Sequence, residues 1–290
     1  MSQSRHRRPA RNGAKSDASP AQAANFRNLK SKKNIDHQGR NPLKTRDRAS
    51  LPEGVFVVEG VAAIREYLRF KPEVIQKIFV KERALKSVRD ELGEFKVELV
   101  KVAESSDDSS PHTPAWAHVV HEMLDWTKFL TYIDRAKDRD HDLVLVLDHI
   151  SDPRNLGAIV RSAAFFGVEY VIVPERRQVL LTQASVNTAQ GGFALTELVL
   201  VVNVSRALEE LKKQGYWVLG AAMRGEPVSS IRGRYEKQVL VLGSEDKGIS
   251  QHVLEGCDVL VSISGAEKSL DSLNVSVAAG ILLQQLVHTS

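Results

Sequence analysis

The stretch Ser269–Leu283, SLDSLNVSVAAGILL, joins a polar opening to an apolar helical pattern near the end of the chain. Apolar residues recur at helical spacing at positions 275, 278, 282 and 286. Either Ser272 or Asn274 can cap this helix, because a short side-chain oxygen accepts a hydrogen bond from a free N–H of the first turn. By itself the stretch predicts only a capped, buried C-terminal helix. Two more polar loops occur upstream, each directly after an apolar strand. Their presence makes it more plausible that the stretch belongs to a functional site.

From residue 142 onward the sequence alternates apolar runs with helical patterns, beginning with Leu143–Leu147. An unbroken apolar run is typical of a strand buried on both faces of a parallel sheet. The alternation therefore predicts an α/β domain over residues 142–290, with helices on both faces of the sheet. Ligands bind beyond the carboxyl ends of the strands in such sheets. The predicted strands lie at 143–147, 170–173, 198–202, 217–221, 239–242 and 259–263, and the predicted helices at 155–166, 204–214, 250–256 and 275–288.

Residues 51–122 predict a smaller α/β domain ahead of the main one, at the low end of domain sizes. Residues 105–114 read as a loop, and 123–141 read as a connector. The connector contains a polar helix, Leu124 to Lys137, with Trp126, Phe129 and Tyr132 on its apolar side. The predicted elements of the smaller domain are strands at 55–58, 75–80 and 97–102 and helices at 61–68 and 85–92.

Residues 1–50 form a basic tail with thirteen Lys and Arg against three Asp. The whole chain carries a formal charge of +4, so residues 51–290 carry −6 (4 − 10). The tail has few apolar residues to bury, which predicts disorder. A basic arm of this kind often contacts nucleic acid. An organelle transit peptide stays an alternative, although the tail shows no amphipathic period.

The composition excludes several classes of protein. The single Cys257 rules out a disulfide framework and a cysteine zinc site, and it is typical of a reducing cytosol. No apolar run reaches the ~20 residues of a membrane span, so we expect a cytoplasmic protein without one. His112, His118 and His121 lie close together, but no cysteine or suitably placed carboxylate completes a metal site. Loop or packing histidines are the favoured interpretation.

The first of the three polar loops lies within Asp148–Gly167 and opens a helix that we expect Asn155 to cap and Gly167 to end. Arg161 lies ~9 Å along the helix axis from Asn155, at 1.5 Å per residue. It is either a structural, ion-paired arginine or a group whose planar fork of donors holds a phosphate or an alkoxide. The first loop alone does not decide between these interpretations.

The second loop, Gly243–Ser250, contains two glycines that let the backbone approach a ligand closely. It matches neither a phosphate-binding loop nor the dinucleotide fingerprint. The third loop is the opening stretch together with Ile263 and Gly265 before it. Its serines lack a His–Asp pairing and a nucleophile elbow, so hydrogen bonding to a ligand or to backbone is favoured over acyl transfer.

Together the three loops resemble the motifs of the SpoU (TrmH) family of RNA ribose 2′-O-methyltransferases, in the SPOUT superfamily of S-adenosylmethionine enzymes. Asn155–Ala158 with Arg161–Ala163 is similar to the first motif, Leu242–Ile249 to the second and Ser272–Ala278 to the third. The order and spacing match over residues 143–288. Residues 54–122 are similar, more loosely, to the RNA-binding substrate domain with a ribosomal-protein-like fold that several members carry.

The resemblance implies a SPOUT domain with a C-terminal trefoil knot, S-adenosylmethionine in the bend of the knot, and a homodimer whose interface helps to form the active site. It implies methylation of a ribose 2′-hydroxyl in RNA, with a guanosine of ribosomal RNA favoured and transfer RNA as an alternative. Carried over by position, the cofactor contacts are Gly243, Ile263 and Leu273, with Leu242 and Gly248 in the surrounding loop. The catalytic and substrate-positioning residues are Asn155, Arg161, Glu245, Ser272, Asn274 and Ser276.

The chemistry implied in this way needs no metal and no covalent intermediate, because the sulfonium methyl is already electrophilic. The protein has to align the hydroxyl with the methyl and help it to lose a proton. A guanidinium hardly ever deprotonates, so we expect Arg161 to hold the adjacent phosphate and to stabilise the developing alkoxide.

The chain departs from the family pattern at Ile263–Ala266, where the usual Pro and Met are missing, and the segment to Asn274 is one residue longer. The loop Asn187–Gly192 also differs from the usual sequence. These departures leave a rival function open. The chain is then a non-catalytic RNA-binding protein, or a structural ribosome-assembly factor, on a SPOUT fold that has lost cofactor use.

Overall fold

The computed structural model describes residues 51–93, 95, 97–103, 113–135, 141–176, 181–266 and 272–287. The predicted basic tail, most of the predicted loop at 105–114 and His112 lie outside the described residues. All described residues belong to one unit, Thr45–Ser290. Among the described helices, none combines the length and the hydropathy that a membrane span needs.

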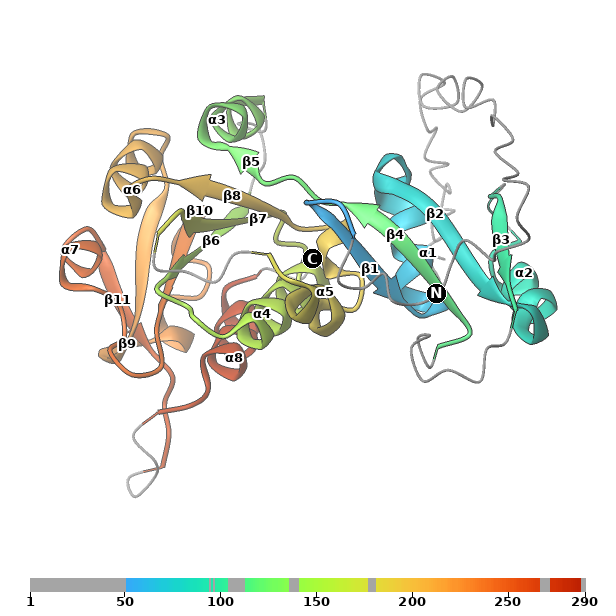
Figure 1. The fold of residues 1–290 in the computed structure, drawn as a ribbon. Helices are drawn as coiled ribbons and strands as arrows, with labels where there is room; N and C mark the ends of the chain where they lie inside the picture. Colours follow the sequence, from blue (N-terminus) through green and yellow to red (C-terminus); the bar gives the residue numbers. More distant parts are fainter. Residues whose placement is uncertain are drawn as a thin grey trace, which may run out of the picture. The chain divides into compact units, whose positions relative to one another are not determined.

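A parallel sheet forms the centre of the main domain, with strand order β11-β9-β10-β6-β7-β8-β5 (Figure 1). Its strands are β5 (Leu124–Asp125), β6 (Asp142–Asp148), β7 (Tyr170–Pro174), β8 (Glu197–Val201), β9 (Trp217–Pro227), β10 (Lys237–Gly243) and β11 (Val259–Ser262). The six strands predicted from apolar runs are confirmed. The short β5 was not predicted, and it pairs with β8, so the connector begins as an edge strand of the main sheet.

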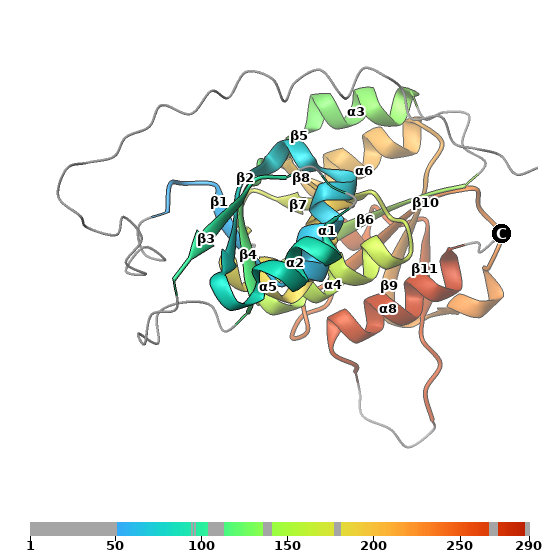
Figure 2. The same ribbon diagram turned by 90° about the vertical axis from the view of Figure 1, so that its right-hand side faces the viewer.

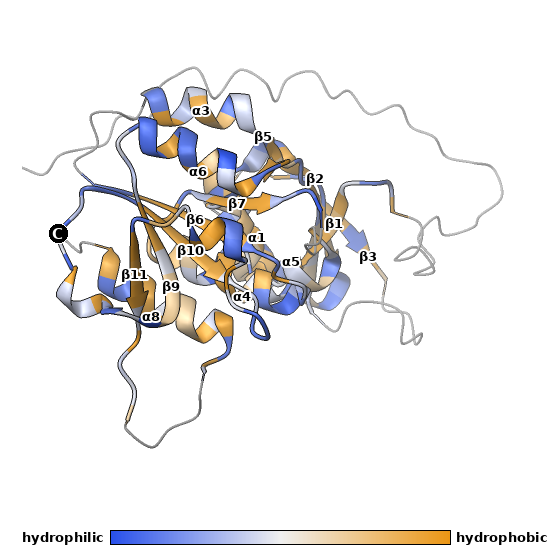
Figure 3. Cartoon of the chain, turned by 90° about the vertical axis from the view of Figure 1, so that its left-hand side faces the viewer, coloured by the Kyte–Doolittle hydropathy of each residue, from blue (hydrophilic) through white to orange (hydrophobic). Residues whose placement is uncertain are grey.

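Helices cover both faces of this sheet (Figures 1 and 3). In β6, Leu145 and Leu147 belong to one core cluster, whereas Val144 and Val146 belong to the other. The first layer holds α4 (Pro153–Phe165), α5 (Gln183–Ala189) and α8 (Val275–Leu286), and the second holds α3 (Trp126–Arg135), α6 (Val204–Lys213) and α7 (Gln251–Leu254). Burial on both faces explains the unbroken apolar runs in the sequence.

A second sheet of four strands lies in the smaller domain, with order β1-β4-β2-β3 (Figure 2). Its elements are β1 (Val55–Glu59), α1 (Val61–Phe70), β2 (Ile75–Lys81), α2 (Leu85–Glu91), β3 (Leu99–Val102) and β4 (Ala115–Val120). The central strand β4 was not predicted. Its alternation of alanines with Trp116 and His118 conceals a strand that pairs antiparallel with β1 and β2. The short helices η4 (Pro72–Val74), η5 (Glu82–Ala84), η6 (Gly192–Ala194) and η7 (Val228–Ser230) complete the fold.

The smaller domain packs against the main domain, and buried residues of both domains form one continuous hydrophobic core. Ile64 and Tyr67 of α1 belong to the same buried cluster as Leu145 and Leu147. His121, directly after β4, lies 2.6 Å from the Tyr67 hydroxyl and packs its ring against Phe193. Burial, with a smaller contribution from Lys71, lowers the pKa of His121 to about 3, so the imidazole is neutral. His118 and His121 are therefore packing histidines in and beside a strand.

The predicted start of the helix in the first loop is wrong for a local reason. Asp152, not Asn155, caps α4: its carboxylate accepts from the backbone N–H of Arg154 at 2.8 Å, and Pro153 takes the first helical position. That hydrogen bond holds the pKa of Asp152 below its ordinary value. Gly167 ends α4 as predicted, in the left-handed conformation at φ 76°.

The predicted loop at 187–192 and the predicted helix at 250–256 also differ from the structure. Residues Gln183–Ala189 form α5, which a capping box between Thr182 and Ser185 starts. The helix α7 is limited to Gln251–Leu254. The segment that forms α5 is polar and is followed by glycines, so its sequence conceals a helix with a short buried face.

The packing of α4 on α5 depends on Gly157, whose missing Cβ would lie 2.4 Å from the carbonyl oxygen of Ser185. We expect Gly157→Ala to lower the free energy of unfolding by ~1–3 kcal/mol, because backbone must move to admit the methyl group. Urea unfolding followed by circular dichroism measures this loss. Gly280→Ala in α8 is the control, since its Cβ would meet only the Ser162 hydroxyl at 3.8 Å and alanine favours helix. Equal stability of the two variants would contradict the close approach.

Candidate active site at the carboxyl edge of the sheet

The three predicted loops meet at the carboxyl edge of the sheet. Two of them leave neighbouring strands, and the third returns to that edge. β6 and β10 end together, since Asp148 and Gly243 are register partners. The loop after β6 leads into α4, and the loop after β10 carries Glu245. α8 contacts α4, η7 and β10, which brings the third loop to the same edge.

One carboxylate oxygen joins the three loops. Oε1 of Glu245 accepts hydrogen bonds from the Asn155 side chain at 3.2 Å, from the Asn274 side chain, and from the backbone N–H of Val275 at 3.2 Å. The Asn274 amide also donates to Oδ1 of Asn155 at 3.0 Å. We call these three side chains the Asn–Glu–Asn cluster. It contains one predicted residue from each motif.

Asn274 has a second role as the cap of α8. Its Oδ1 accepts from the backbone N–H groups of Ser276 at 3.0 Å and Val277 at 3.4 Å. The Ser276 hydroxyl donates to the same oxygen. The carboxylate of Glu245 thus lies at the positive end of a helix dipole, where a negative charge is stabilised. The predicted cap Asn274 is confirmed, and Ser276 is fixed to it.

The loop after β10 folds back tightly on its own strand. Ser244 and Gly248 exchange backbone hydrogen bonds of 3.0 and 2.9 Å. A Cβ on Gly243 would lie 2.1 Å from the carbonyl carbon of Gly248, so only glycine fits there. Gly248 adopts φ 67°, which glycine reaches at no steric cost. Both glycines are therefore required by the turn that presents Glu245.

A buried carboxylate that sequence reasoning missed anchors this loop. Asp148 is 1% exposed, and its Oδ2 accepts from the backbone N–H of Ser250 at 2.7 Å. Its Oδ1 lies 2.6 Å from Nδ1 of His149, a residue with the uncommon φ of 62°. Positive φ in a residue other than glycine is strained and is frequent at functional sites. The signal in the sequence was an acidic residue that ends a buried strand.

Arg161 is not part of the Asn–Glu–Asn cluster. Its side chain is exposed and makes no hydrogen bond or ion pair with another residue that the structure describes. Its backbone lies under η6, since a Cβ on Gly192 would lie 3.2 Å from the Arg161 Cα. The structural interpretation of Arg161 as an ion-paired residue therefore has no support within the described part of the chain.

The remaining predicted residues surround the cluster. Leu242 is buried in β10, and Ile263 packs at the edge of the core just after β11. Ser272 and Leu273 lie next to Asn274 and are exposed, Leu273 by 48%. Residues 267–271, which precede them, lie outside the described residues. Leu273 thus offers an apolar surface beside the cluster.

Neither a metal site nor a reactive thiol is found in the described part of the chain. No group of three His, Cys, Asp or Glu side chains with metal-binding geometry occurs there. Burial raises the pKa of the Cys257 thiol to about 11, so this thiol stays protonated and is a poor nucleophile.

Comparison with known proteins identifies relatives of the main domain alone and relatives that match 79% of this chain. The model of the SpoU rRNA Methylase family matches residues 142–284. The 23S rRNA (guanosine-2′-O-)-methyltransferase RlmB of Coxiella burnetii is 32% identical over 237 residues, which cover 79% of this chain and 94% of RlmB. An uncharacterized tRNA/rRNA methyltransferase of Mycolicibacterium gilvum is 39% identical over 155 residues, 53% of this chain and only 49% of that relative. The chain thus spans about half of that mycobacterial relative and nearly all of RlmB.

The fold has a counterpart among solved structures. The SpoU methyltransferase AviRb of Streptomyces viridochromogenes, crystallised with the cofactor AdoMet, aligns with a TM-score of 0.67. The alignment covers 83% of this chain and 91% of AviRb at 23% identity. At that identity the likeness establishes the fold.

A double-mutant cycle tests whether the Asn–Glu–Asn cluster holds the loops together. We expect Asn155→Ala and Glu245→Ala to show a coupling free energy of ~1 kcal/mol in urea unfolding, because each variant removes the same hydrogen bond. Asn155→Ala combined with Gln251→Ala is the control and should be additive, since Gln251 bonds to Glu255 on α7 instead. Additivity in both cycles would show that the cluster does not tie α4 to the second loop.

Proposed function

We propose that this chain, which belongs to the SpoU rRNA methylase family, transfers the methyl group of S-adenosylmethionine to a ribose 2′-hydroxyl of RNA. The observation that carries the proposal is the Asn–Glu–Asn cluster, in which residues of all three motifs meet at the ligand-binding edge of a parallel sheet. Hydrogen-bonding groups of this kind orient a ribose.

The substrate we propose is a guanosine of 23S ribosomal RNA. The support is the relative RlmB, which the chain matches over 94% of its length, smaller domain included. A transfer RNA substrate is the alternative, because other relatives bear the broader name tRNA/rRNA methyltransferase. We also propose that the smaller domain binds the RNA.

The residues at the edge of β10 and β11 fit the cofactor that we propose. Gly243 and Gly248 bring backbone close to the edge, Ile263 and Leu273 supply apolar contacts for the adenosine, and the Glu245 carboxylate suits a neighbouring cation. S-adenosylmethionine supplies an electrophilic methyl group when it is bound. We further propose that the segment leading into α8 passes through a loop of the chain as a trefoil knot, which agrees with the return of α8 from β11 to α4.

In the proposed reaction the side chains of this chain align the hydroxyl and stabilise charge. Asn155 and Glu245 orient the ribose, and Ser272, Asn274 and Ser276 fix the third loop and the nucleotide. Arg161 holds the neighbouring phosphate and stabilises the 2′-oxygen as its proton passes to solvent water, because its guanidinium keeps its charge.

Arg161 needs a second copy of the chain to reach this role. Four residues after it, on the same face of α4, the Phe165 side chain is 83% exposed. Val277 and Ile281 form a matching exposed pair on α8, at 51% and 37%. Such apolar side chains on two packed helices favour an interface. We propose a homodimer through this surface, with Arg161 of one protomer beside the Asn–Glu–Asn cluster of the other.

A rival function rests on the segment Ile263–Ala266, which lacks the usual Pro and Met. In this case the chain binds RNA without using the cofactor. Calorimetry with S-adenosylmethionine separates the two: micromolar binding supports the methyltransferase, whereas no heat of binding at millimolar cofactor supports the rival.

Arg161→Ala tests the proposed reaction. We expect transfer of a tritiated methyl group to ribosomal RNA to fall by at least ~100-fold, the typical loss when one charge-stabilising donor is removed. Cofactor affinity by calorimetry should stay within about twofold. The matched control is Arg206→Ala, an exposed arginine on α6 that pairs with Glu210 and should keep full activity. Wild-type turnover in Arg161→Ala would remove this residue from the reaction.

Phe165→Asp tests the proposed dimer. We expect analytical ultracentrifugation to show monomers, because a charge replaces an apolar side chain at the centre of the interface. Methyl transfer should fall with dimerisation, whereas the fold stays intact because the site is exposed in one copy. Val202→Asp introduces the same charge at another side chain, 79% exposed at the end of β8, and should leave the dimer unchanged. A dimer that persists in Phe165→Asp places the interface elsewhere.

A further inference from the structure

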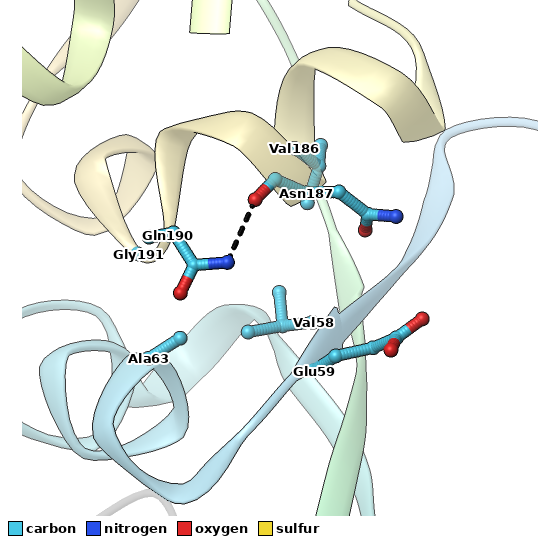
Figure 4. Close-up of a pocket in the computed structure, with 7 residues that line it drawn as sticks. All are labelled: Val58, Glu59, Ala63, Val186, Asn187, Gln190 and Gly191. Atoms are coloured by element: carbon cyan, nitrogen blue, oxygen red, sulfur yellow. Dashed lines mark hydrogen bonds between the residues drawn. The ribbon is translucent and has the colours of Figure 1, made fainter. Parts of the chain in front are cut away.

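A cleft of about 100 Å³ lies between the smaller domain and helix α5 (Figure 4), and none of its lining residues belongs to the Asn–Glu–Asn cluster. Val58, Glu59 and Ala63 line it from β1 and α1. Val186, Asn187, Gln190 and Gly191 line it from α5 and the turn that follows. Its walls are partly apolar, and three polar side chains lie at its edge.

The amide of Asn187 is oriented by another amide. Nε2 of Gln183 donates to Oδ1 of Asn187 at 2.7 Å and to the carbonyl oxygen of Val57 at 2.6 Å. Oε1 of Gln183 accepts from the backbone N–H of Val57 at 2.9 Å. Because the Asn187 oxygen is used in this way, its NH₂ group is left as a donor at the cleft. Figure 4 shows this amide on the same side as the Glu59 carboxylate.

The amide of Gln190 is oriented as well. Its Nε2 donates to the backbone oxygen of Asn187 at 2.9 Å, so its Oε1 is left as an acceptor, and Figure 4 shows it directed toward Ala63. Gln190 has φ 50° and ψ 46°, a left-handed conformation that glycine adopts without strain. A strained residue with an ordered side chain is a sign of function.

The width of the cleft is set by backbone. A Cβ on Gly191 would lie 3.3 Å from the Cα of Ala63, so α1 and the end of α5 approach as closely as their backbones allow. The space left beside this contact is walled by Val58, Ala63 and Val186. Apolar walls with fixed donors and acceptors at the edge suit a planar heterocycle.

We propose that this cleft binds an unpaired guanine base of the RNA substrate, outside the nucleotide that is methylated. The inference rests on the proposed function for its RNA. Guanine offers one acceptor, O6, for the Asn187 NH₂ group, and two donors, N1–H and N2–H, for Gln190 Oε1, which has two lone pairs. These atoms form the Watson–Crick edge of guanine, on which unpaired bases of RNA are commonly recognised. α5 packs on α4, so the bound base lies about one helix diameter from the helix that carries Asn155.

Binding of short labelled RNAs to the full chain tests this proposal by fluorescence anisotropy. The probes are oligouridines of equal length with a central guanosine, a central adenosine or a central abasic ribose, so that contacts of the basic tail are the same for all. We expect the guanosine probe to bind about tenfold more tightly than the other two. Equal affinity for the three probes would overturn the proposal.

The variants separate base recognition from folding. Gln190→Gly relieves the left-handed strain, so it should raise or keep the melting temperature while the guanosine preference falls to about one. Asn187→Ala should lose most of the preference as well. Gln251→Ala removes an exposed glutamine that bonds to Glu255 on α7 and should keep the preference. A preference that survives Gln190→Gly refutes the assignment of the cleft.

Failure of the cleft proposal is distinguishable from failure of the proposed function, because the anisotropy experiment measures RNA binding and not methyl transfer. Methylation of ribosomal RNA without a guanosine preference would reject the cleft alone. A guanosine preference without methylation or cofactor binding would reject the methyltransferase alone.

Discussion

The arrangement of the candidate active site depends on one oxygen atom, Oε1 of Glu245. It accepts hydrogen bonds from side chains 90 and 29 residues away in sequence and from the first backbone N–H of α8. A charged acceptor makes stronger hydrogen bonds than a neutral one, and here the helix dipole adds to the attraction. The three loops therefore meet before any substrate arrives. Such preorganisation lowers the cost of reaching a charged transition state.

A similar device fixes the smaller domain. The side chain of Gln183 bonds to both the backbone N–H and the backbone carbonyl oxygen of Val57 on β1. Lys71 on the smaller domain pairs with Glu197 on β8. The neutral His121 fills the junction against Tyr67 and Phe193. With a continuous core beneath these contacts, the smaller domain is held against the main one. An RNA that contacts both domains thus meets a surface of fixed dimensions.

The sequence predicted the parts of the fold that repeat a simple pattern. Strands buried on both faces, such as β6 and β10, show as apolar runs, and Asn274 shows as a cap because capping is local. β4 was missed, since the residues that alternate with Trp116 and His118 are the small alanines Ala115 and Ala117, which give only a weak apolar signal. α5 was missed because only tertiary contacts, such as Gly157 against Ser185, make its polar segment worth ordering. The meeting of Asn155, Glu245 and Asn274 followed from motif order, but the anchoring role of Asp148 depends on register, which the sequence does not show.

The position of Arg161 explains why this fold is expected to work as a pair. Asn155 and Arg161 share α4, yet six residues rotate their side chains by ~240° about the axis, so the two side chains leave the helix in different directions. The Asn155 face is committed to Glu245, and the Arg161 face carries the exposed Phe165. In the homodimer that we propose, a second copy placed there brings its Arg161 to the Asn–Glu–Asn cluster, and burial of the apolar side chains supplies the free energy that holds the two copies together.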